Sequence, residues 1–159
     1  MRPKPFLPQL LNGDERFIRD GRTGTVWHRA HLRTLYADTD RSSVVYHANY
    51  LRYFEFGRAS LMRDFEYPYA EVEEKGYVYP IISQSIDYYH PLRYDDPMWV
   101  HTRPGELERV RITFDYVITH AETGQLICRG YTRHCALKAS GAVTAVDDET
   151  VRMWKAFPR

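Results

Sequence analysis

The sequence predicts an α+β domain in which one long helix packs on a curved antiparallel sheet. A chain of 159 residues is one domain's worth and is long enough to bury a core. Its hydrophobic pattern has a helical period over residues 47–66 and becomes strand-like in four runs from residue 80 onward. Aromatic residues make up 14% of the chain, which favours a β-rich fold because such side chains suit pleated, half-buried surfaces. A strand, a long helix and then a run of strands is the order of an α+β domain.

The chain is expected to divide near residue 29. Residues 1–29 predict an N-terminal extension, because prolines open the segment and the glycines at positions 21 and 24 mark a turn. Residues 30–159 predict a single domain whose first strand covers residues 30–37.

A long helix is expected over residues 47–66. Its apolar stripe has three- and four-residue spacing and consists of Leu51, Phe54, Leu61, Met62 and Phe65. Pro68 ends this helix, and a shorter helix over residues 70–75 closes on Gly76. Gly57 lies in the middle of the long helix, where the missing side chain allows the helix and sheet backbones to approach closely.

Four strands are expected after the helices. They cover residues 80–90, 98–104, 110–120 and 125–138, and a final amphipathic helix covers residues 148–157. The run over 110–120 alternates between apolar and more polar side chains, which predicts one buried face and one wetter face.

Charge and cysteine content exclude several classes of protein. The net charge is +1 with no block of basic residues, so we expect no nucleic-acid partner. No apolar run approaches the ~20 residues that a membrane span needs, and residues 1–8 lack the apolar core of a secretory signal. Cys128 and Cys135 are seven residues apart in one expected strand, so they cannot bridge each other and should be free thiols. We expect a cytoplasmic protein.

The most informative stretch runs from Tyr36 to Arg58. An expected strand leads into Asp38 and Asp40, a short polar turn follows, and the long helix begins near His47. A helix start carries unpaired backbone N–H groups that can hold a developing oxyanion, while a nearby carboxylate acts as base or nucleophile. This stretch therefore predicts half of an active site, and either aspartate could supply the carboxylate.

The same stretch resembles the hotdog-fold acyl-CoA thioesterases of the 4-hydroxybenzoyl-CoA thioesterase type, including their Tol–Pal-associated bacterial relatives. The matching signature is Asp40, three small or polar residues, a valine pair, then Tyr46 and His47 at the helix start. A second match is the run Tyr89–Asp96, which is similar to the family's entry to its third strand. The resemblance covers residues 32–137 and implies the hotdog fold.

The resemblance also implies a reaction, the hydrolysis of an acyl-CoA thioester to a free carboxylic acid and CoA. Asp40 matches the catalytic aspartate, as nucleophile or as general base towards water. The backbone N–H of His47, or one beside it at the helix start, would polarise the thioester carbonyl. No metal or cofactor is implied. The resemblance further implies a homodimer or homotetramer with its sites at the dimer interface.

Further residues are candidates for substrate binding, each beside a structural alternative. Tyr46 and Tyr50 line an acyl pocket or pack in the core, and Glu55 acts as a helix carboxylate or pairs with Arg52 or Arg58. Arg109 and Arg111 lie where some relatives contact CoA phosphates. Ser43 stands where the family usually has glycine, so it either tightens the turn differently or contributes its hydroxyl.

Two rival functions remain open. One is a hotdog enoyl-CoA hydratase or dehydratase, although the chain lacks the Asn-Pro and the closer Asp–His spacing of those enzymes. The other is a non-catalytic hotdog protein that binds acyl-CoA or a partner, for which the altered turn at Ser43 is the main support.

Overall fold

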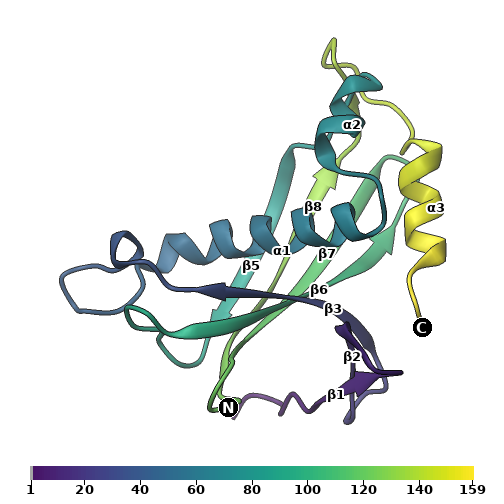
Figure 1. Cartoon of the computed structure of the whole chain (residues 1–159). Coiled ribbons are helices and arrows are strands. Elements are labelled where there is room, and N and C mark those ends of the chain that lie inside the picture. Colours follow the sequence, from purple (N-terminus) through teal and green to yellow (C-terminus); the bar gives the residue numbers. More distant parts are fainter. Residues whose placement is uncertain (1) are drawn as a thin grey trace.

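A computed structural model describes residues 2–159 and contains a seven-stranded antiparallel sheet crossed by one long helix (Figure 1). The strand order is β1-β2-β3-β6-β7-β8-β5, and every neighbouring pair is antiparallel. The strands of this sheet are β1 (Pro8–Leu11), β2 (Asp14–Asp20), β3 (Val26–Arg33), β5 (Ile81–Tyr88), β6 (Pro97–Leu107), β7 (Arg111–His120) and β8 (Leu126–Cys135). A separate two-stranded sheet pairs β4 (Tyr77–Val78) with β9 (Leu137–Lys138).

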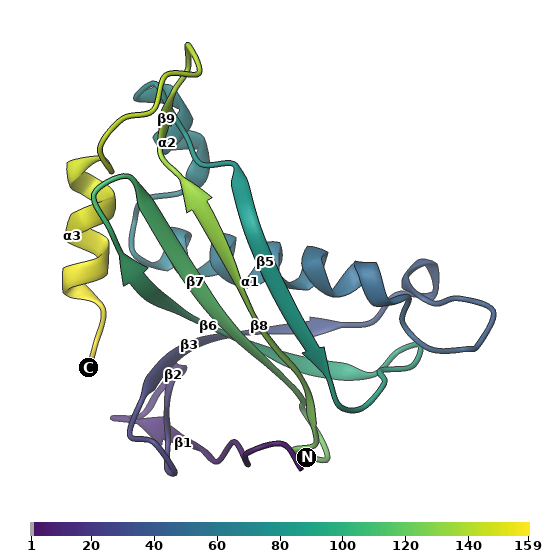
Figure 2. The same cartoon turned by 180° about the vertical axis from the view of Figure 1, so that it is seen from behind.

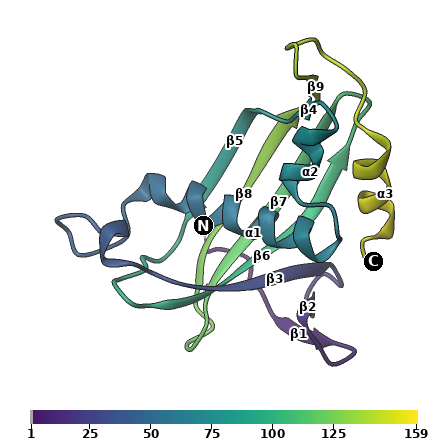
Figure 3. The ribbon, with the colours of Figure 1, turned by 45° about the horizontal axis from the view of Figure 1, so that its top comes forward.

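The helices lie mainly on one face of the sheet. The long helix α1 (Tyr50–Asp64) crosses that face, α2 (Tyr69–Glu74) follows it, and α3 (Asp148–Ala156) packs beside the far end of β6 and β7 (Figure 3). Two short 3₁₀ turns, η1 (Tyr36–Asp38) and η2 (His47–Asn49), precede α1. The expected helix on an antiparallel sheet is confirmed. The first strand was expected over residues 30–37, but β3 ends at Arg33 and η1 takes up the following residues.

Gly57 allows α1 to lie directly on the sheet, as the sequence predicted. A Cβ atom added there would lie 2.6 Å from Cγ1 of Val100 and would overlap Oγ1 of Thr102, both on β6. One turn earlier, the ring of Phe54 stacks on that of Tyr116 with 4.2 Å between centroids. Because of this close approach, α1 packs directly on β6 and β7 and buries the main core between helix and sheet.

The opposite face of the sheet is covered by the N-terminal segment. Phe6, Ile18 and Trp27 pack there against Val117 and Leu126 in a second apolar cluster. Figures 1 and 2 show the first residues running back toward the end of β7 and β8.

This covering corrects the expectation of a wetter face over residues 110–120. Val117 on that face packs against the N-terminal cluster of Phe6 and Trp27, and Thr113 and Thr119 on the same face are also buried. Strands β1 and β2 also extend the sheet beyond β3, so residues of the expected extension build the sheet itself. The division of the chain at residue 29 stays a prediction, and β3 runs across it.

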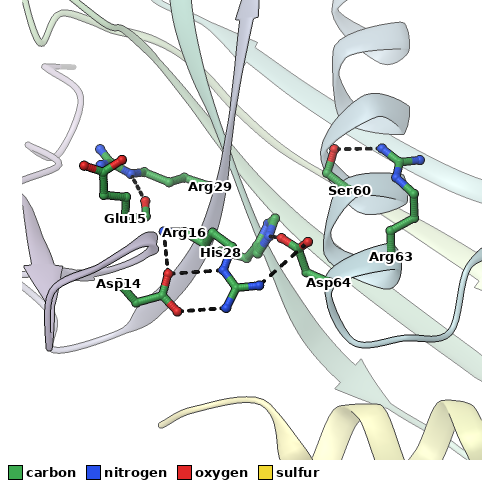
Figure 4. Close-up of polar contacts among 8 residues, drawn as sticks. All are labelled: Asp14, Glu15, Arg16, His28, Arg29, Ser60, Arg63 and Asp64. Carbon is green, nitrogen blue, oxygen red and sulfur yellow. Dashed lines mark hydrogen bonds and ion pairs between the residues drawn. The ribbon is translucent and has the colours of Figure 1, made fainter.

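A polar cluster ties the N-terminal hairpin to the end of α1 (Figure 4). Nε2 of the buried His28 lies 2.7 Å from Oδ2 of Asp64, and Arg16 reaches the other oxygen of Asp64 at 3.9 Å. Arg16 in turn makes two side-chain hydrogen bonds to Asp14. Burial lowers the pKa of His28 against the opposing pull of Asp64. The neutral ring therefore donates its Nε2 proton to Asp64.

Both cysteines lie on β8 and are free thiols, Cys128 buried and Cys135 half-buried, as the spacing predicted. Within residues 2–159, no helix is both long and apolar enough to cross a membrane. The same residues contain no group of three or more His, Cys, Asp or Glu side chains arranged to hold a metal ion.

Candidate active site

The turn before α1 is anchored by Asp38, whose carboxylate is buried. Its Oδ2 accepts hydrogen bonds from the N–H of Leu35 at 3.0 Å and from the hydroxyl of Tyr53 at 2.9 Å. Its Oδ1 lies 3.3 Å from a guanidinium nitrogen of Arg52, and its main-chain carbonyl accepts from the N–H of Tyr46. These contacts use both carboxylate oxygens to hold the turn onto α1, so Asp38 has a structural role.

Asp40 lies on the same turn but is exposed to solvent. Its Oδ1 accepts a 2.7 Å hydrogen bond from the N–H of Ser42, which fixes the side chain against its own turn. Its backbone N–H donates to the carbonyl of Val44 at 2.9 Å, and its carbonyl accepts from Ser43 N–H at 3.0 Å. Among the described residues, nothing donates to Oδ2. Asp40 is therefore an oriented carboxylate with one free oxygen.

Ser43 adopts the left-handed conformation that the family's glycine would favour, with φ = 64°. A side chain in this region brings Cβ close to the neighbouring carbonyl, which is why glycine is preferred there. The Ser43 hydroxyl forms no hydrogen bond with any residue from 2 to 159. The turn therefore keeps the backbone path that a glycine would take, at the cost of strain at Ser43.

The start of the helical segment presents free backbone donors. The N–H groups of His47 and Ala48 meet no hydrogen-bond acceptor within the described part of the chain, as the first turn of a helix leaves them. The carbonyl of His47 accepts a 2.8 Å hydrogen bond from the hydroxyl of Tyr88, which fixes this backbone against β5. The side chain of His47 is exposed, with the ring of Tyr46 against it at 4.5 Å between centroids.

Tyr46 and Tyr50 have different surroundings. Tyr50 is 3% exposed, packs edge-on against Tyr53 and Tyr88, and lines a shallow hollow together with His47. Burial raises the pKa of Tyr50 to about 12, so its hydroxyl stays protonated. Tyr46 is 46% exposed and does not line this hollow. Of the two tyrosines, Tyr50 belongs to the core beside the helix start.

Glu55 is exposed and stands at the rim of two hollows, one on each side of α1. The expected ion pair with Arg52 or Arg58 is wrong. Arg52 contacts Asp38 instead, and Arg58 donates a 3.4 Å hydrogen bond to the hydroxyl of Tyr116. Within residues 2–159, Glu55 takes part in no ion pair.

Arg109 and Arg111 lie at the turn between β6 and β7, far from Asp40 in the same protomer. Arg111 is exposed and pairs with Glu108 at 3.2 Å. Asp40 follows the end of β3, and Arg33 at that end pairs with Pro97 at the start of β6. This is the opposite end of β6 from the turn that carries the two arginines. The 10 residues of β7 span ~33 Å between those two ends. One protomer therefore does not bring these arginines to Asp40.

A cavity that sequence reasoning missed lies under the second half of α1. It has a volume of about 150 Å³ and opens beside Glu55, with α2, α3 and β7 around it. Its deeper apolar walls are Met62, Ile112, Phe114, Met153 and Trp154. Helical spacing placed Met62 and Trp154, and strand alternation placed Ile112 and Phe114, only on the apolar faces of their own elements. A void between separate elements leaves no signal in sequence spacing.

The fold and this site together define a family. The sequence pattern of the Thioesterase-like superfamily matches residues 34–153, which include the turn, α1 and most of the sheet. The chain belongs to this superfamily.

Individual relatives agree with this membership. YneP of Bacillus subtilis (strain 168) is 32% identical over 130 residues, which cover 80% of this chain and 87% of YneP. The acyl-CoA thioester hydrolase YbgC of Escherichia coli O6:H1 is 28% identical over 98 residues, or 62% of this chain and 73% of YbgC.

The fold also matches a solved structure of known class. A mutant 4-hydroxybenzoyl CoA thioesterase in complex with 4-hydroxybenzoyl CoA superposes with a TM-score of 0.72 at 19% identity. The match covers 80% of this chain and 97% of that one. At this identity the likeness concerns the fold alone, and it confirms the predicted hotdog fold.

Proposed function

We propose that this protein is an acyl-CoA thioesterase that hydrolyses its substrate to a free carboxylic acid and CoA. Membership of the Thioesterase-like superfamily and the similarity to the acyl-CoA thioester hydrolase YbgC support the activity. The single observation that carries the mechanism is the turn itself. It holds the Asp40 carboxylate with one oxygen free, just before a helix start whose His47 and Ala48 N–H groups are also free.

In the proposed reaction, the thioester carbonyl oxygen accepts hydrogen bonds from the backbone N–H of His47 or Ala48. Asp40 either removes a proton from an attacking water or attacks the carbonyl carbon itself. The C–S bond then breaks, and the thiolate of CoA leaves and takes up a proton. If Asp40 is the nucleophile, water hydrolyses the resulting anhydride. One N–H donor of this kind contributes ~2.7–4 kcal/mol to lowering the barrier.

The proposed assembly is a homodimer, alone or as half of a homotetramer, formed through β5. Among the described residues, this edge strand pairs only with β8, and Ile81, Ile82 and Tyr88 along it are 41%, 52% and 48% exposed. An apolar, unpaired edge is a template for another strand. A two-fold axis at β5 would continue the sheet and set two α1 helices side by side in opposite directions. The helix start of one subunit would then face the second half of α1 in the other. Because acyl-CoA is the proposed substrate, we also propose a cytoplasmic location.

Replacing Asp40 tests the mechanism. The variant Asp40→Asn should keep its circular dichroism and unfolding midpoint, while thiol release from an acyl-CoA panel falls at least ~100-fold. Asp148→Asn is the matched control, because Asp148 is an exposed aspartate at the start of α3 and far along the chain from the turn. Retention of activity in Asp40→Asn contradicts the role of Asp40. Tight acyl-CoA binding without thiol release from any substrate contradicts the proposed activity and favours a binding protein.

Glu55 is the second candidate for the catalytic carboxylate, because it is exposed, unpaired within residues 2–159 and at the mouth of the cavity. The variant Glu55→Gln separates the two. Loss of activity in Glu55→Gln with activity retained in Asp40→Asn would transfer the catalytic role to α1. We also propose substrate contacts for Tyr46, Ser43, Arg109 and Arg111. The two arginines reach the site only from a neighbouring subunit.

A further inference from the structure

We propose that residues 2–7 are an assembly lock, a strap that covers the outer face of the sheet and prevents a second copy of this chain from packing on it. The outer face is the one opposite α1, and the strap runs across it from β1 toward the ends of β7 and β8 (Figure 2). The strap precedes residues 34–153, so it lies outside the part of the chain that matches the superfamily. The inference goes beyond the proposed activity and uses none of its residues.

One aromatic ring closes the centre of the outer face. Phe6 is 6% exposed, whereas its neighbour Leu7 is 52% exposed. The ring of Phe6 packs edge-on against Trp27 and His101, with 5.9 Å and 4.6 Å between ring centroids, and Val117 belongs to the same apolar cluster. Nε1 of Trp27 and Nε2 of His101 are buried without a hydrogen-bond partner among residues 2–159. The strap therefore covers this centre by apolar contact and not by hydrogen bonds.

Hydrogen bonds to the backbone fix the path of the strap on either side of that ring. Arg129 on β8 donates to the carbonyl of Lys4 at 2.7 Å, and its guanidinium lies 6.0 Å from the centre of the Phe6 ring. Arg22, in the turn between β2 and β3, donates to the carbonyl of Pro5 at 3.0 Å. The strap is thus held by its own carbonyl groups, while Phe6 supplies its side-chain contact with the apolar cluster.

Charged side chains of both signs surround the cluster that the strap covers. Arg103 on β6 is directly opposite Asp115 on β7, and their side chains pair at 3.4 Å. Arg129 on β8 is opposite Val117 on one side and Asp87 of β5 on the other. An apolar centre with a charged rim is the usual composition of a protein–protein interface. Without the strap, the outer face would have this composition.

The mixture of charges in the rim favours a second copy of the same chain as the partner. A two-fold axis places one patch against an identical patch, so each charged group needs a partner of opposite sign within the patch itself. Arg103 and Arg129 provide one sign, and Asp87 and Asp115 provide the other, whereas a rim of one sign would repel its copy. Pairing through the outer face leaves the edge strand β5 available. It would therefore join two existing assemblies and double their mass.

The test measures the mass of full-length variants by light scattering after size-exclusion chromatography. Phe6→Asp places a carboxylate in the apolar cluster and should displace the strap, because a charge is costly to bury there. Leu7→Asp adds the same carboxylate at the neighbouring exposed position and is the matched control. We expect Phe6→Asp to have about twice the wild-type mass. Leu7→Asp, and Phe6→Leu with its apolar side chain, should keep the wild-type mass.

A double variant locates the contact. Val117→Lys combined with Phe6→Asp adds a positive charge opposite Arg129 at the centre of the uncovered face, and it should restore the wild-type mass. Circular dichroism checks that each variant is folded. If Phe6→Asp does not fold, Phe6→Ala takes its place, because it removes the ring without adding a charge.

Three outcomes would overturn the inference. One is a folded Phe6 variant, Phe6→Asp or its replacement Phe6→Ala, that keeps the wild-type mass. Another is a doubled mass that persists with Val117→Lys, because the contact would then lie elsewhere on the molecule. The third is a broad range of larger species in place of a doubled mass, because the uncovered face would then not select one copy. Each measurement is of mass, so none depends on whether the protein releases thiol from acyl-CoA.

Discussion

Ser43→Gly is the substitution that tests the turn most directly. Ser43 is held at φ = 64°, where an L side chain costs roughly 1–2 kcal/mol. Glycine removes this cost but loses about 0.4–1 kcal/mol through the greater freedom of its unfolded chain. The expected net gain in the free energy of unfolding is about 0.5–1 kcal/mol. For a chain of 159 residues this corresponds to a rise in Tm of roughly 1–4 °C.

The neighbouring serine supplies the matched control. Ser42 has an ordinary negative φ, and only its backbone N–H bonds to Asp40, so Ser42→Gly keeps that contact and gains nothing from relief of strain. It should lower the free energy of unfolding by about 0.5–1 kcal/mol. Urea unfolding of wild type, Ser43→Gly and Ser42→Gly gives the comparison at constant m-value.

Ser43→Ala separates the backbone from the hydroxyl. Alanine keeps the strained conformation, so its stability should equal that of wild type. Because the hydroxyl forms no hydrogen bond within residues 2–159, any fall in thiol release measures its proposed contact with the substrate. A Ser43→Gly protein no more stable than Ser42→Gly would refute the reasoning about strain. A large loss of activity in Ser43→Ala, with stability unchanged, would instead assign the hydroxyl to the site.

Three further substitutions or titrations test the packing. Gly57→Ala should lower the free energy of unfolding by about 1–3 kcal/mol in urea, because the overlap with Val100 outweighs the ~1 kcal/mol gain in helix propensity; a more stable variant would contradict the close packing. Asp147→Ala should lower the free energy of unfolding by about 3 kcal/mol or more, because it leaves the Tyr79 hydroxyl buried without its acceptor and removes the cap of α3. A loss below ~1 kcal/mol would argue against this hydrogen-bond network. Burial lowers the pKa of His134 to about 4 from an unfolded value of 6.5, so its stabilising contribution is complete above pH 6.5 and is lost as the pH falls toward 4. The free energies of unfolding measured in urea at pH 7 and pH 4 should differ by about 3 kcal/mol because of this group. The variant His134→Gln should reduce that difference.

Local patterns predicted the elements because those patterns are set by neighbouring residues. The three- and four-residue spacing around Phe54 predicted α1, and two-residue alternation predicted β7 with its inward face toward the helix. Gly57 signalled the close approach of helix and sheet, since only a missing side chain permits it. The spacing of Cys128 and Cys135 in one strand excluded a disulfide on reach alone.

Contacts between distant segments could not be predicted in the same way. The burial of Val117 depends on Phe6, more than 100 residues earlier, folding back over the sheet. No periodicity encodes that return. The predicted ion pair of Glu55 with Arg52 or Arg58 was wrong for a related reason. Arg52 contacts the buried carboxylate of Asp38, which lies outside the helix.

For the candidate site, the sequence by itself determined the turn, the helix start after it and the position where serine replaces glycine. The tertiary structure decided which aspartate is free: Tyr53 and Arg52 from α1 bind Asp38, and the turn leaves an oxygen of Asp40 open. It also formed the cavity under α1, which exists only where α1, β7 and α3 meet. A motif reports which groups are adjacent along the chain, whereas burial and empty volume are set by side chains that only folding brings together.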